Sequence, residues 1–185
     1  MSERTKLKDG IALTFARGDD LGSALKAARS ALSRVVYPPD EDWDGKSLQW
    51  TSAEFSALCC DESGKALSHV GAVLRQGKAN GANVKIGGIG SVMTHPDARR
   101  QGLAAAGIDA AVDMFRDESV DFGFLVCAEA LLPLYGRLGW KRFDGDVYVT
   151  QRGKRVLFTF NHSMVLPICA EAPDGGEIDL LGPPW

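Results

Sequence analysis

The six residues Arg99-Arg100-Gln101-Gly102-Leu103-Ala104 could together bind a phosphate group. They form a turn between an apolar, strand-like run and a segment whose apolar residues have helical spacing. Backbone N–H groups at a helix N-terminus have no intrahelical partner, and the helix dipole adds partial positive charge there. Gly102 allows the backbone to approach a ligand, and the two arginines offer charge-assisted hydrogen bonds. The turn is therefore suited to a pyrophosphate.

Two other phosphate-binding motifs fail on spacing. The segment Gly88-Ile89-Gly90-Ser91-Val92-Met93 has methionine where a dinucleotide fingerprint has its third glycine. No Gly-Lys-Ser/Thr follows this segment, as a nucleotide P-loop would require. The prediction of a pyrophosphate site therefore rests on the 99–104 turn and on its position after a strand.

Two side chains could transfer protons. Tyr135 lies in a short helical segment, and a phenol with an ordinary pKa of about 10 can protonate a thiolate when geometry and desolvation help. His69 lies in an apolar strand, and its intrinsic pKa suits a general base. The alternatives are a packing tyrosine and a hydrogen-bonded core histidine.

Two segments could bind a cationic amine. Acidic residues surround Trp43 in the run 40–44, which includes Asp42, and carboxylates beside an aromatic ring attract cations. A solvated acidic loop is the alternative. The chain ends in Gly182-Pro183-Pro184-Trp185, and an apolar tail stiffened by proline can dock on the protein where most termini fray.

The elements that must position these residues alternate between strand and helix patterns. We predict a helix over residues 21–35 capped by Asp19 or Asp20, a helix from Leu103 to Phe115, and a short helix carrying Tyr135. A loop is expected over 77–83. The prediction is a mixed α+β sheet. The predicted strands are residues 11–15, 54–60, 67–75, 84–94, 122–127, 140–143, 147–157 with a turn at Gly153, and 158–168.

Length and composition favour one enzyme-sized domain. The chain has 185 residues, 45% of them hydrophobic, which is enough for a full core. The net charge of −3 argues against a nucleic-acid partner, and no apolar leader or membrane-length run is present. The four cysteines lack metal-ligand spacing. We therefore expect a cytoplasmic protein with no membrane partner and no metal, and with all four cysteines buried.

Two motifs resemble those of the GNAT N-acetyltransferase superfamily. Val92-Met93-Thr94, His95-Pro96-Asp97 and the pattern Arg99-x-x-Gly102-x-Ala104 are similar to its acetyl-CoA-binding motif. The run Leu132-Pro133-Leu134-Tyr135-Gly136-Arg137-Leu138-Gly139-Trp140 resembles its second conserved block. Together the two blocks cover residues 84–144 in the expected order. The tail and the central strands also resemble the branch that contains aminoglycoside 2′-N-acetyltransferases.

This resemblance implies the GNAT fold, a mixed sheet of about seven strands flanked by helices, with splayed fourth and fifth strands. It implies one domain over 1–185, an acyl-CoA-binding core at about 84–144, and a tail, 170–185, that completes the acceptor site. The pantetheine arm would pair with the backbone of Val92 and Thr94. The implied cofactor-binding residues are Val92, Met93, Thr94, Arg99, Arg100, Gln101, Gly102, Leu103 and Ala104.

The implied activity is transfer of an acetyl group from acetyl-CoA to a primary amine of a small, cationic acceptor, by direct attack in a ternary complex. Tyr135 would protonate the departing thiolate. Trp185 resembles a terminal tryptophan at the acceptor site of the aminoglycoside branch, and Asp42 and Trp43 are further acceptor candidates. The acidic residue that serves those relatives falls at Gly90. His69, Glu129 or ordered water therefore remain as routes for the amine proton.

Three other functions stay open on the sequence. Gly90 in place of an acid would suit a catalytically degenerate module that binds acyl-CoA as a sensor. An open groove would suit an N-acyltransferase acting on proteins. Met93 and the glycines before it leave room for acyl chains longer than acetyl. Many members of the superfamily that this chain resembles form dimers, so a homodimer is a further possibility.

Overall fold

The computed structural model describes residues 3–38 and 44–185, so Asp42 and Trp43 lie outside the described residues. Contacts divide the chain into two compact units. The first comprises Met1–Asp42, Ala53–Ala72 and Gly90–Asp113, and the second comprises Trp43–Ser52, Val73–Ile89 and Met114–Trp185. Strands β4 (Ala66–Ala79) and β5 (Ala82–Thr94) and helix α2 (Leu103–Asp117) contribute residues to both units.

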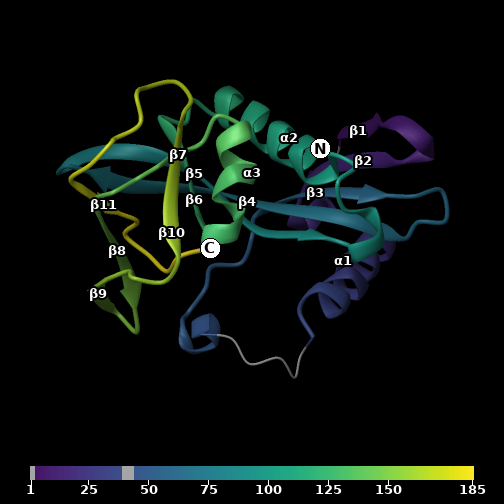
Figure 1. The fold of residues 1–185 in the computed structure, drawn as a ribbon, viewed down its shortest axis with the longest axis horizontal. Helices are drawn as coiled ribbons and strands as arrows, with labels where there is room; N and C mark the ends of the chain where they lie inside the picture. Colours follow the sequence, from purple (N-terminus) through teal and green to yellow (C-terminus); the bar gives the residue numbers. More distant parts are fainter. Residues whose placement is uncertain (1–2, 39–43) are drawn as a thin grey trace. The chain divides into compact units, whose positions relative to one another are not determined.

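The first unit is built on antiparallel strands in the order β1 (Glu3–Lys6), β2 (Ala12–Arg17), β3 (Phe55–Cys60) and β4 (Figure 1). Helix α1 (Ser23–Val36) places an apolar stripe against this sheet because its apolar residues recur every three or four positions. The packed cluster consists of Leu25, Ala28, Leu32, Val36, Leu58, Cys60, Ala66 and Met93.

The start of α1 differs from the prediction. Asp19 and Asp20 lie in a short 3-10 helix, Gly18–Asp20, and α1 begins only at Ser23. Its N-cap is Gly22, and no side chain bonds to the cap. The predicted aspartate cap is therefore wrong, because the extra turn carries both carboxylates out of reach of the first helical N–H groups.

The second unit contains a parallel strand pair. β5 pairs with β6 (Phe122–Cys127) from Ile86↔Phe122 to Ile89↔Leu125, and there the pairing ends although β5 continues to Thr94. β6 pairs antiparallel with β10 (His162–Pro167), and β10 with β7 (Lys141–Arg142). The continuous apolar run of β6 is fully buried at Phe122 and nearly so at Phe124.

The second unit also contains three strands from the C-terminal part of the chain. β11 (Glu177–Asp179) pairs parallel with β8 (Asp146–Gln151) and antiparallel with the last residues of β4, and β8 forms a hairpin with β9 (Lys154–Leu157) (Figure 1). Helix α3 (Leu132–Arg137) follows β6. The core of this unit comprises Val73, Ile86, Phe122, Phe124, Phe143, Val147, Val149, Val165, Ile178, Leu180 and Trp185.

Several expectations need correction. The predicted loop over 77–83 is a hairpin, in which β4 and β5 are joined at Asn80 and Gly81 with φ values of +49° and +83°. An Asn-Gly pair favours this turn because both residues tolerate positive φ. β11 was not predicted, and the described residues form eleven strands where about seven were expected. The α+β fold class is confirmed.

Two findings concern the expected environment of the chain. Within residues 3–38 and 44–185, no helix combines the length and apolar character needed to span a membrane. Cys59, Cys60 and Cys127 are buried free thiols, but Cys169 is exposed. The prediction that all four are buried is therefore wrong for Cys169, which lies just beyond the end of β10.

Candidate functional site

The predicted phosphate turn lies at the start of α2. Arg100 and Gly102 have left-handed φ values of +62° and +78°, and α2 begins at Leu103. The amide of Ala106 donates to the Gly102 carbonyl at 3.0 Å, so the amides of residues 103–105 precede the first helical hydrogen bond of this turn. The turn therefore offers unpaired backbone donors to an anion.

The arginines of this turn remain available to a ligand. Arg99 and Arg100 are exposed, and neither side chain has an ion pair or a hydrogen bond with any described residue, although the Arg99 amide donates to the Pro96 carbonyl at 3.4 Å. Other residues anchor the turn to the protein. The Ala98 amide donates to the His95 carbonyl at 2.9 Å, and the side chains of Ala98 and Leu103 are buried. The residues that hold the turn are thus distinct from those that face solvent.

The end of β5, directly before this turn, presents backbone groups. The Val92 carbonyl accepts a hydrogen bond from the Tyr37 hydroxyl at 3.3 Å, and the Met93 carbonyl accepts one from Ser68 at 2.9 Å. The Met93 side chain is buried against α1, so only its backbone can serve a ligand. The sequence reasoning missed Tyr37. Its one signal was its place at the end of a helix, before Pro38.

The candidate bases occupy different environments. His69 is buried, and its ring nitrogens lie 2.8 Å from the Ser91 carbonyl oxygen and 3.1 Å from the Ser56 hydroxyl. Burial is the main reason that the pKa of His69 falls to about 4. Glu129 is exposed at the start of a 3-10 helix, and Gly90 has no side chain to contribute.

Tyr135 lies in the second unit, on α3. Its side chain is 4% exposed and packs edge-on against Trp140, with ring centroids 6.4 Å apart. The Trp140 amide donates to the Tyr135 carbonyl at 3.1 Å, which fixes the turn between the two rings. The indole N–H of Trp140 is buried without a hydrogen-bond partner among the described residues.

Trp185 is part of the core of the second unit. It is 7% exposed, and its ring lies on the backbone of Gly88, where a Cβ atom would be only 2.0 Å from the indole. The ring packs edge-on against Phe124 at a centroid distance of 5.8 Å, and Nε1 donates to the Phe124 carbonyl at 3.4 Å. Glycine at position 88 is therefore required by the terminal tryptophan.

Polar contacts hold the rest of the tail. Arg75 donates to the Pro183 carbonyl and, at 2.7 Å, to the Thr51 hydroxyl, and its guanidinium lies 5.0 Å from the Trp185 ring centroid. The Thr51 amide donates to the Pro184 carbonyl at 2.6 Å. The C-terminal residues are thus docked on the protein.

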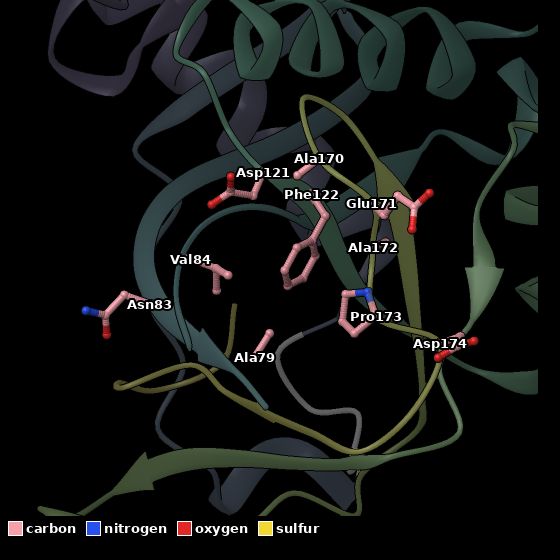
Figure 2. A pocket seen from close by; sticks show the side chains of 10 residues that line it. All are labelled: Ala79, Asn83, Val84, Asp121, Phe122, Ala170, Glu171, Ala172, Pro173 and Asp174. Atoms are coloured by element: carbon pink, nitrogen blue, oxygen red, sulfur yellow. The ribbon is translucent and has the colours of Figure 1, made fainter. Parts of the chain in front are cut away.

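A separate cavity of about 410 Å³ lies in the second unit, and Figure 2 shows the Phe122 ring and Pro173 facing its interior. None of the predicted site residues lines this cavity. Its walls are formed by Ala79, Asn83, Val84, Asp121, Phe122, Ala170, Glu171, Ala172, Pro173 and Asp174. Among the described residues, no group of three or more histidine, cysteine, aspartate or glutamate side chains is placed to hold a metal ion.

The structure thus gathers the predicted residues into two groups. In the first unit, β5 leads into the 99–104 turn, and His69 contacts the same strand through Ser91. In the second unit, Tyr135 and Trp185 are buried at separate places, on α3 and at the chain end.

Comparisons with known proteins identify a family and a shared fold. Residues 15–143 match the family model of the acetyltransferase (GNAT) domain. The fold is similar to a GNAT family N-acetyltransferase, YhbS, from Escherichia coli in complex with CoA, with a TM-score of 0.62, 13% identity, and coverage of 96% of this chain and 94% of that one. None of the curated protein sequences matches this chain.

Two further solved structures share the fold. The ribosomal-protein-S18-alanine N-acetyltransferase from E. coli has a TM-score of 0.54 at 19% identity, covering 88% of this chain and 97% of that one. An acyl-CoA N-acyltransferase from Pseudomonas aeruginosa has a TM-score of 0.55 at 19% identity, covering 84% and 99%.

The family match spans well over half of the chain. The chain therefore belongs to the GNAT acetyltransferase domain family. It is an acyl-CoA-dependent N-acyltransferase. The amides of residues 103–105 and the unpaired side chains of Arg99 and Arg100 suit the pyrophosphate of such a co-substrate, because an anion needs donors that the fold has not already used.

Proposed function

We propose that this protein transfers an acetyl group from acetyl-CoA to a primary amine of a small, cationic acceptor, by direct attack in a ternary complex. The observation that carries the proposal is the 99–104 turn, where the amides of residues 103–105 precede the first helical hydrogen bond and both arginine side chains are unpaired among the described residues. Membership of the GNAT family supports acetyl-CoA as the donor.

The co-substrate would bind along one continuous segment of the first unit. The amides of residues 100–104 would hold the pyrophosphate, with Arg99, Arg100 or both adding charge-assisted contacts. The backbone of Val92, Met93 and Thr94 would pair with the pantetheine arm as an added strand. This proposal is supported by β5, which runs five residues beyond its last pair with β6.

The chemistry needs a neutral amine and a proton for the leaving group. The amine nitrogen attacks the thioester carbonyl carbon, and the C–S bond breaks as the N–C bond forms. The Tyr135 hydroxyl protonates the departing thiolate sulfur, and the attacking nitrogen gives up its proton through water. The burial of Tyr135 supports this role because desolvation disfavours a free thiolate beside it.

The acceptor class rests on Trp185. Its ring sits on Gly88, one residue before the last paired position of β5, and an aromatic ring attracts a cationic amine. Arg75 already lies over the ring, so an acceptor would meet the ring edge. An amino sugar of the kind used by aminoglycoside 2′-N-acetyltransferases fits this description, with Asp42 and Trp43 as further proposed contacts.

The test measures thiol release from acetyl-CoA with aminoglycosides, polyamines and peptides as acceptors. We expect release with a cationic small molecule and a fall in kcat of about 10²-fold or more in Tyr135→Phe. Intersecting initial-rate lines would support a ternary complex. Tight acetyl-CoA binding without release for any acceptor would instead favour the sensor function.

A conservative variant tests the acceptor contact separately. Trp185→Phe keeps an aromatic ring on Gly88 but removes the indole N–H that bonds to Phe124. If Trp185 binds the acceptor, the KM for the acceptor should rise in this variant while the KM for acetyl-CoA stays constant. An unchanged acceptor KM would remove Trp185 from the proposed site.

A further inference from the structure

His69 of β4 has a single tautomer fixed by its contacts. It is 2% exposed, with Nδ1 2.8 Å from the Ser91 carbonyl oxygen and Nε2 3.1 Å from Ser56 Oγ. A carbonyl oxygen only accepts hydrogen bonds, so Nδ1 carries the ring proton. Nε2 then accepts the hydroxyl proton of Ser56. Both nitrogens of the neutral imidazole are therefore in use.

The surroundings keep this imidazole neutral. Arg29 donates to Ser56 Oγ at 3.4 Å, which completes a chain from Arg29 through Ser56 and His69 to Ser91. Burial lowers the pKa of His69 to about 4, the Arg29 charge acts in the same direction, and the bond to Ser91 opposes them. At neutral pH, His69 is thus a fixed hydrogen-bond donor whose lone pair is occupied.

The acceptor of that donor has an unusual backbone conformation. Ser91 lies within β5 but has a left-handed φ of +49°, which a residue with a side chain adopts only when its surroundings impose it. β4 approaches closely here, since a Cβ atom on Gly71 would lie 3.0 Å from the Gly90 carbonyl oxygen. The contact with His69 is therefore one of the forces that hold Ser91 in this conformation.

The conformation of Ser91 sets the direction of the next backbone groups. The carbonyls of Ser91 and Met93 both accept from β4 side chains, His69 and Ser68. The Val92 carbonyl accepts from Tyr37, which follows α1. Since the Ser91 and Met93 carbonyls are bonded from β4 and the Val92 carbonyl is bonded from Tyr37, the Val92 carbonyl is assigned to the other edge of β5. This is the edge to which an added strand would bind.

We propose that His69 is a positioning residue for acyl-CoA binding. By donating Nδ1–H to the Ser91 carbonyl, it holds the left-handed residue that directs the Val92 backbone toward the pantetheine arm. The inference rests on the proposed function, because the arm is the ligand that this strand edge would bind. His69 acts through Ser91 and takes no proton from the acceptor amine.

Two amide variants separate the two contacts of His69. Asparagine places a donor at the δ position and retains the bond to Ser91, whereas glutamine places its amide at the ε position and retains only the contact with Ser56. Calorimetric titration with acetyl-CoA should show binding about tenfold weaker in His69→Gln and within about threefold of wild type in His69→Asn. The pH profile of kcat should be the same in all three proteins.

A second pair of variants works through Ser91 itself. Glycine adopts positive φ freely, so Ser91→Gly added to His69→Gln should restore most of the lost affinity. Ser91→Val opposes positive φ through its branched Cβ, and because Ser91 is exposed this variant keeps the core intact. It should weaken acetyl-CoA binding about tenfold even if His69→Gln does not fold.

The outcomes distinguish the inference from the proposed function. Equal acetyl-CoA affinity in wild type, His69→Gln and Ser91→Val would overturn the positioning role and leave the proposed function standing. A collapse of kcat with loss of a pH limb in both amide variants would also overturn it, because His69 would then be the base. No acetyl-CoA binding by the wild type would overturn the proposed function and the inference with it.

Discussion

The 99–104 turn and the C-terminal tail use arginine in opposite ways. In the turn, Arg99 and Arg100 are exposed, and their side chains bond to no described residue. Beside the tail, Arg75 donates to Pro183 and Thr51 and lies over the Trp185 ring. The guanidinium groups of the turn are therefore available to a ligand, whereas the guanidinium group beside the tail is bonded within the protein.

The difference has an energetic basis. A buried donor or acceptor left without a partner costs about 1–3 kcal/mol, so a tail that is buried must satisfy its carbonyls. An exposed turn is hydrated and has no such requirement. Substitutions in the tail should therefore change the free energy of unfolding, and substitutions of the free arginines should change only ligand affinity.

Removal of the Trp185 side chain should have the largest effect on stability. Trp185→Ala opens a cavity against Gly88 and Phe124, and we expect a loss of about 3–5 kcal/mol in the free energy of unfolding. Leu181→Ala is the matched control, because this tail residue is 53% exposed and should lose less than about 0.5 kcal/mol. Urea unfolding of both proteins measures the difference. Equal stability would mean that the tail is not docked in solution.

The next largest effect should be the fall in the free energy of unfolding at acid pH, which we attribute to His69. In the unfolded chain the imidazole takes up a proton near pH 6.5, whereas in the folded protein its pKa is about 4. Between these values the unfolded state binds more protons, so stability falls as the pH is lowered and the loss is complete near pH 4. We expect His69 to account for about 3 kcal/mol between pH 7 and pH 4.

The check compares unfolding of wild type and His69→Asn across this range. The variant should lose the corresponding part of its pH dependence, whatever its stability at pH 7. Parallel curves for the two proteins would show that His69 titrates normally and is accessible to water. His69 sharpens the comparison because it bonds to β5 in the unit that contains the 99–104 turn, and yet both of its ring nitrogens are bonded within the protein, as the donors of Arg75 are beside the tail.

The sequence predicts the local parts of this molecule well. β6 begins and ends where its apolar run does, at Phe122 and Cys127, because a strand buried on both faces is apolar throughout. The turn before α2 was also predicted, since Gly102 directly precedes the helical spacing that begins at Leu103. Patterns of this kind need no knowledge of distant contacts.

The hydrogen-bond partners of several residues were not predicted, because they lie far away in the chain. Tyr37 bonds to a carbonyl 55 residues away, His69 to one 22 residues away, and Trp185 to one 61 residues away. β11 has only three residues, so its pattern is too short to signal a strand, and its pairing partners supply the stability. Tertiary contacts decide such features, and local spacing does not encode them.

Arg75 should have a smaller but clear effect on stability. Arg75→Met keeps the aliphatic packing and removes the donors to Pro183 and Thr51, and hydrogen bonds of this charged kind contribute about 2 kcal/mol. Arg142→Met is the control, because Arg142 pairs with Asp144 at 2.7 Å with both side chains more than half exposed. Such a surface pair contributes at most about 1 kcal/mol. Equal losses in the two variants would contradict the docking role of Arg75.

Substitution of Arg99 or Arg100 should have the smallest effect. Unlike the substitutions near the tail, it should change the affinity for acetyl-CoA and leave the free energy of unfolding unchanged. Arg99→Ala or Arg100→Ala removes a charge that the fold does not use, so thermal unfolding should be unchanged while the Kd for acetyl-CoA rises about threefold to thirtyfold in at least one variant. The effect should shrink at high salt, because exposed charges are screened. Arg152→Ala, on the exposed β8–β9 turn, serves as the charge-matched control. If affinity is unchanged in both variants, the backbone amides alone hold the pyrophosphate, and the unpaired arginines are simply hydrated surface.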